Sequence, residues 1–249
     1  MRRAAARYGC ANNLKQIALG LLNYADTYVP GQHPPEHELP AGTLFLAGLP
    51  PEQRLSWYVD VLPFIEQDNL YRSFDRKRGW DDPANIPAAQ TPLKTLSCPD
   101  WAREAEPHPP YTAYLGVAGL GADAATLPIG DRKDGVFGYD RRTPLSAIQD
   151  GTSNTLLILE SARDNGPWAR GGPSTVRGLD PGEAPYLGAA RPFGGTHFTE
   201  NTVFGHGKPI DCHAAMADGS VRVLSHSVAP DILEALATIA GGETVGDGW

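Results

Sequence analysis

The residues of this chain whose types suit chemistry gather toward its C-terminal end. His197, His206, Asp211 and His213 lie close together in the sequence, and imidazole and carboxylate groups are ligands that Zn²⁺ takes in proteins. Their spacing matches no H-E-x-x-H motif, and in a strand Cys212 and His213 point to opposite faces. We therefore predict no metal, and keep these four residues as weak candidates for a metal-dependent hydrolase.

A second polar group precedes an apolar run. Asp150, Thr152, Ser153 and Asn154 can form hydrogen bonds that fix a turn, and the apolar residues after them are typical of a buried strand. Glu160 ends that strand and is the one carboxylate placed where it could do chemistry. Ser153 lacks the G-x-S-x-G elbow of a serine nucleophile. We expect a structural turn, no catalytic residue and no cofactor, with ligand contact by the turn as the alternative.

Aromatic residues punctuate the Gly/Pro-rich stretch from 165 to 201. This stretch is too long for a plain connection, so it predicts a loop that wraps the sheet or offers a binding surface. Trp168, Tyr186 and Phe198 could stack on a sugar ring there, although core packing explains aromatic residues more simply. Together with the turn at Asp150–Asn154, they define an alternative function as an extracellular solute- or glycan-binding protein.

The first element that must position these residues is a long helix, predicted from Arg2 to Tyr28. Its apolar residues recur at steps of three and four, so they form one stripe, and Pro30 ends the pattern. We divide the chain into this spine helix (1–29) and a globular α+β part (30–249). The apolar stripe includes Leu14, Ile17, Leu21 and Leu22.

The rest of the chain predicts a sheet flanked by short helices. Val203–Leu224 has the pattern of two strands, joined by a turn at Asp218 and Gly219. A second helical segment begins at Trp57, and Pro230 opens a short final helix. We predict an α+β fold in which a long N-terminal helix packs on an antiparallel β-sheet, with long Pro/Gly-rich loops and a short C-terminal helix.

Charge and hydropathy exclude several classes of partner. The net charge is −8 and the pI is about 5.3, which opposes binding to nucleic acid because phosphate contacts need basic patches. No run of apolar residues is long enough to span a membrane, and the two arginines after Met1 are not followed by the apolar core of a signal peptide. The sequence as given therefore predicts neither an anchor nor a signal.

Long, unusual strings along the chain resemble the DUF1559 (SBP_bac_10) family, the pilin-like proteins that are numerous in planctomycetes. They occur in the same order as in that family and cover most of the chain. They are CANNLKQIALGLLNYADTY (Cys10–Tyr28), SWYVDVLPFIEQDNLY (Ser56–Tyr71), LSAIQDGTSNTLLILES (Leu145–Ser161) and ADGSVRVLS (Ala217–Ser225).

The resemblance implies a non-enzymatic, extracytoplasmic pilin- or pseudopilin-like subunit of a type IV pilus-like or type II secretion-like assembly. Its partners would be other pilin-like subunits, contacted through the spine helix. It would meet a membrane only through the apolar segment that typically precedes this helix in the family, which the sequence as given lacks. The implied assembly surface is the stripe of Leu14, Ile17, Leu21 and Leu22.

The resemblance also bears on the cysteines. Cys10 and Cys98 stand where the family tends to carry cysteine, and in an exported protein they could pair. Buried free thiols are the alternative.

Overall fold

The computed structural model describes residues 2–27, 37–100, 109–188, 191–194, 197, 211–243 and 245. Its main sheet has five strands in the order β5-β2-β4-β6-β7, and a small second sheet pairs β1 with β3. The strands are β1 Glu38–Leu39, β2 Tyr114–Leu120, β3 Thr143–Pro144, β4 Leu156–Glu160, β5 Val176–Leu179, β6 Asp211–Met216 and β7 Val221–Ser225.

Neighbouring strands of the main sheet are antiparallel except at one edge. β2 pairs antiparallel with β4, β4 with β6, and β6 with β7, whereas β5 runs parallel to β2. The predicted hairpin is present as β6 and β7, and Gly219 occupies its turn with a φ of +78°. The part of this prediction that covers 203–210 lies outside the described residues.

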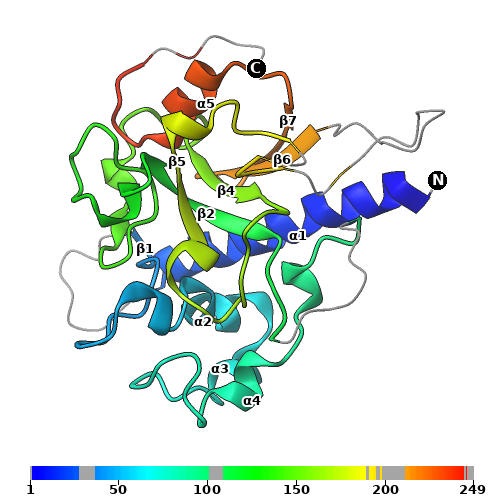
Figure 1. The fold of residues 1–249 in the computed structure, drawn as a ribbon, viewed down its shortest axis with the longest axis vertical. Helices are drawn as coiled ribbons and strands as arrows, with labels where there is room; N and C mark the ends of the chain where they lie inside the picture. The colour runs from blue at the N-terminus through cyan, green and yellow to red at the C-terminus, as the bar shows by residue number, and fades with distance from the viewer. Residues whose placement is uncertain are drawn as a thin grey trace.

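Helices lie on both faces of the sheet. α1 spans Arg2–Ala25 and contacts β4, β6 and β7, whereas α5, at Pro230–Ala237, contacts β2, β4 and β5 (Figure 1). The predicted α+β fold, with its long first helix and short last helix, is confirmed. Along the described chain, no helix has both the length and the apolar character needed to cross a bilayer. The other α-helices are α2 Trp57–Val61, α3 Asp68–Tyr71 and α4 Ile86–Ala89.

The apolar stripe of α1 belongs to the main core. Leu14, Ile17 and Leu21 are 0% exposed, and Leu22 is half-buried. Our prediction that this stripe forms the assembly surface is therefore wrong for the three buried residues, because the body of the same chain already covers them. The predicted spine and globular parts share one core.

Close packing explains a glycine in the middle of α1. A Cβ built on Gly20 would lie 2.8 Å from Cγ2 of Ile65, in the 3-10 turn that follows α2. Such a separation is well inside ordinary carbon contact distances. The glycine therefore allows the backbone of α1 to approach this turn.

The alternation of side chains along each strand assigns residues to the two faces of the sheet. In β2, Tyr114 packs in the core on the α1 side and Leu115 in the cluster beside α5. In β6, Cys212 belongs to the α5 cluster and Ala215 to the α1 core. The period of two then places His213 on the same face as α1.

Candidate functional site

A buried carboxylate forms the centre of the site. Glu160 is the last residue of β4, is paired with Tyr114 of β2, and is 0% exposed. Its Oε1 lies 3.2 Å from Nε2 of His197, and its Oε2 lies 3.1 Å from Nδ1 of His213. The backbone N–H of His213 also donates to Oε2, at 2.8 Å. The carboxylate is therefore held from two directions by groups on other segments.

The two histidines contact each other as well as Glu160. Nε2 of His197 and Nδ1 of His213 are 3.1 Å apart, and the residues are 1% and 5% exposed. The other ring nitrogen of His197, Nδ1, lies 2.9 Å from Oδ2 of Asp100. His197 thus lies between two carboxylates, one on each ring nitrogen.

Electrostatics favour the charged forms of Glu160 and His197. Burial alone raises the pKa of Glu160, but hydrogen bonds from His197 and His213 outweigh it and bring that pKa to about 2. Burial lowers the pKa of His197, but Glu160 and Asp100 together raise it above its ordinary value. Glu160 is therefore a carboxylate at neutral pH, and its negative charge favours a positive charge on the imidazole of His197.

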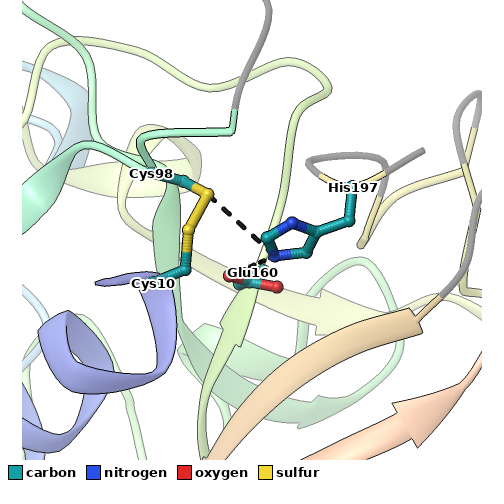
Figure 2. A group of neighbouring side chains, drawn as sticks. All are labelled: Cys10, Cys98, Glu160 and His197. Atoms are coloured by element: carbon teal, nitrogen blue, oxygen red, sulfur yellow. Dashed lines mark hydrogen bonds and ion pairs between the residues drawn. A yellow bond between two sulfur atoms is a disulfide. The ribbon is translucent and has the colours of Figure 1, made fainter. Parts of the chain in front are cut away.

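A disulfide lies beside this group. Cys10 of α1 and Cys98 are bonded across a sequence separation of 88, so the predicted pairing is confirmed and the free-thiol alternative is wrong. Sγ of Cys98 is 4.0 Å from Nε2 of His197. Figure 2 shows His197 reaching toward both the disulfide and Glu160. Potential ligand atoms of Cys10, Cys98, Glu160 and His197 lie within 4.8 Å of one another, but sulfurs bonded to each other are not thiolates.

The histidines line a surface pocket of about 420 Å³. Its size falls within the range of small-molecule sites. Its lining comes from α1, β6 and β7 together with His197. The lining residues are Arg7, Tyr8, Ala11, His197, Asp211, His213, Val221 and Val223.

The sequence-based metal candidates meet only in part. His197 and His213 come together, and Asp211 lines the same pocket, whereas His206 lies outside the described residues. The sequence pattern indicated Glu160 as a carboxylate placed for chemistry, but it did not predict the contact between Glu160 and the histidines. It gave no indication of Asp100. The one available signal for Asp100 was its place two residues after the half-cystine Cys98.

Two of the aromatic residues considered for glycan contact are buried. Trp168 is 0% exposed and donates its indole N–H to the carbonyl of Thr91, and Tyr186 is 1% exposed. Both rings are packed in the core, as the simpler interpretation expected, so the alternative in which they stack on a ligand is wrong for these two residues. Phe198 lies outside the described residues.

The turn before β4 has a structural role instead. The carboxylate of Asp150 accepts backbone N–H bonds from Gly241 and Gly242, at 2.8 and 3.1 Å. The carbonyl of Thr152 accepts the N–H of Asp218 in the β6–β7 turn. These contacts join three distant segments, as expected of a structural turn. Ser153 is half-buried, and exposed Asn154 donates a long bond to the Asp150 carbonyl.

A search of the curated proteins and a search of the solved structures each find no match to this chain. The family model SBP_bac_10, described as a protein of unknown function (DUF1559), matches residues 1–231. Since this match covers most of the 249 residues, the chain belongs to the DUF1559 family.

Proposed function

We propose that this protein is a non-enzymatic, extracytoplasmic, pilin- or pseudopilin-like subunit of a type IV pilus-like or type II secretion-like assembly. The observation that carries the proposal is the two-faced character of α1. One face is buried in the core, while the opposite face carries two exposed large hydrophobic residues, Tyr8 at 78% and Leu19 at 43%. A helix with a covered face and a partly apolar outer face suits contact with a second helix.

The exposed residues of α1 form a continuous outer stripe. Tyr8, Asn12, Lys15 and Leu19 are all exposed, and steps of four, three and four residues keep them on one side of a helix. With a rise of 1.5 Å per residue, Tyr8 and Leu19 are about 16 Å apart along the axis. The N-terminal turns of α1 extend past the edge of the sheet (Figure 1), which leaves this end accessible to a neighbouring subunit.

The disulfide supports an extracytoplasmic location. Disulfides persist in oxidising compartments and are rare in the reducing cytosol. The Cys10–Cys98 bond also fastens the projecting half of α1 to the body of the protein.

Site-directed photo-crosslinking tests the proposed contact. A benzoylphenylalanine is placed at Tyr8 or Leu19 of the protein expressed in its native cell, and crosslinked products are identified by mass spectrometry. Phe45 and Ile129, which are 67% and 43% exposed, serve as controls of comparable exposure. We expect crosslinks to pilin-like subunits from positions 8 and 19 and not from 45 and 129.

Two outcomes would contradict the proposal. One is an absence of crosslinked pilin-like subunits at positions 8 and 19 when the protein is shown to be exported and folded. The other is recovery of the protein from the cytosol with Cys10 and Cys98 reduced.

A further inference from the structure

The buried group at the sheet has the dimensions of a metal site. Nε2 of His197, Nδ1 of His213 and the carboxylate oxygens of Glu160 are separated by 3.1 to 3.2 Å. Zinc binds imidazole nitrogen and carboxylate oxygen at about 2.0–2.2 Å, which places neighbouring ligand atoms about 2.9–3.5 Å apart in common geometries. The three side chains therefore already have the separations that one shared ion requires.

The surroundings hold the three side chains in place. Asp100 lies 2.9 Å from Nδ1 of His197, on the side of the ring away from Glu160. Metal-binding histidines commonly donate their other ring N–H to a carboxylate in this way, which fixes the tautomer and the ring orientation. The backbone N–H of His213 orients Oε2 of Glu160. Glu160 and His213 are also fixed by neighbouring strands of the sheet.

The donor set selects the class of ion. Two imidazoles with one carboxylate suit divalent transition metals, whereas Ca²⁺ and Mg²⁺ prefer oxygen ligands alone. The nearby sulfurs of Cys10 and Cys98 are joined to each other, so they do not turn the group into a thiolate site. The two histidines line the pocket next to α1, which gives an ion a path from solvent and room for a water ligand.

We propose that His197, His213 and Glu160 bind one divalent transition-metal ion, of which Zn²⁺ is the best probe, with Asp100 as the residue that orients His197. The ion would join the segment that carries His197 to β4 and β6, beside the disulfide that holds α1. A remaining coordination position faces the pocket and takes water. This inference stands apart from the proposed function, since it needs no partner subunit.

Calorimetric titration of the purified, oxidised chain with ZnCl₂ tests the proposal. After dialysis against a chelator and its removal, we expect one Zn²⁺ to bind per chain. Asp100→Asn lowers the affinity by about 10- to 100-fold, as is typical for loss of an orienting carboxylate. His226→Gln, a change at an exposed histidine after β7, leaves the affinity unchanged. His197→Gln, His213→Gln and Glu160→Gln each weaken binding by more than Asp100→Asn does.

A second measurement on the wild-type chain covers the case in which these variants do not fold. Crystals soaked in ZnCl₂ are expected to show an anomalous scattering peak between His197, His213 and Glu160. The Co²⁺ form is expected to show d–d absorption without a thiolate charge-transfer band. The proposal is overturned if folded wild-type protein binds no Zn²⁺ or if the anomalous scattering peak lies elsewhere. It is also overturned if a thiolate charge-transfer band in the Co²⁺ form shows that Cys212 is a ligand.

Discussion

Loss of the Cys10–Cys98 disulfide is expected to destabilise the protein strongly. The bond closes a loop of 88 residues. In the chain-entropy treatment, opening such a loop in the unfolded chain changes its entropy by about 15 cal/mol/K, which is about 4.6 kcal/mol at 25 °C. The double variant Cys10→Ala/Cys98→Ala should lose most of this amount. The loss is large compared with a typical free energy of unfolding of about 5–15 kcal/mol.

Urea unfolding followed by circular dichroism measures the effect. With a slope of about 2–3 kcal/mol/M, the midpoint of the double variant should fall by about 1.5–2.3 M. Adding a reductant should lower the midpoint of the wild type by a similar amount and leave the double variant unchanged. The variant Cys212→Ala, which keeps the disulfide, should still respond to the reductant.

A small loss of stability in a two-state transition would contradict the expected contribution of the disulfide. A loss below about 1 kcal/mol in the double variant would mean that the loop is already restricted in the unfolded chain, so that the bond removes little entropy. A response of the double variant to reductant would show that another thiol reaction causes the shift.

Three further changes should alter the free energy of unfolding, each measured by the same urea titration. Leu14→Ala should cost about 2–5 kcal/mol because it leaves a core cavity, while Leu19→Ala, at a 43% exposed position of the same helix, should stay within about 0.5 kcal/mol; equal losses would contradict the assigned burial. Gly20→Ala should destabilise the protein by about 1–3 kcal/mol, because the added Cβ would collide with Ile65. In a helix without such an obstruction, the change from glycine to alanine is stabilising. A gain in stability would therefore show that α1 has room for the Cβ. Tyr58→Phe should cost about 1–3 kcal/mol because its hydroxyl bonds two buried oxygens, at 2.7 and 3.0 Å; an unchanged midpoint would contradict these bonds.

Local patterns account for the elements that could be predicted. Two elements depend only on neighbouring residues: the first helix, with its apolar steps of three and four, and the turn at Asp218-Gly219. The sequence alone is therefore sufficient to predict both. The same periodicity says that a face is apolar but not what covers it. The pattern therefore does not distinguish a contact with another subunit from the chain's own core, in which Leu14 and Leu21 lie.

The candidate site depends on contacts between distant segments. His197 is 37 positions from Glu160 and 97 from Asp100, so the spacing within the histidine-rich stretch carried no information about either carboxylate. The burial of Trp168 also depends on residues that are distant in the sequence. Its indole N–H is satisfied by a carbonyl 77 positions away, and the Gly/Pro-rich composition around it left ligand contact open as an alternative to packing.

The packing of α1 also affects the order in which the chain can fold during synthesis. Lys15 donates to the carbonyl of Gly219, 204 positions later, and the neighbouring strand β6 covers part of the same helix. At a translation rate of about 5–20 residues per second, some 10–40 seconds pass between the two. During that interval the apolar side of the first helix lacks β6 and β7, the strands that cover part of it. The first helix to be synthesised is covered in part by a hairpin that is synthesised near the end of the chain. A prematurely terminated chain would therefore leave apolar residues of that helix exposed.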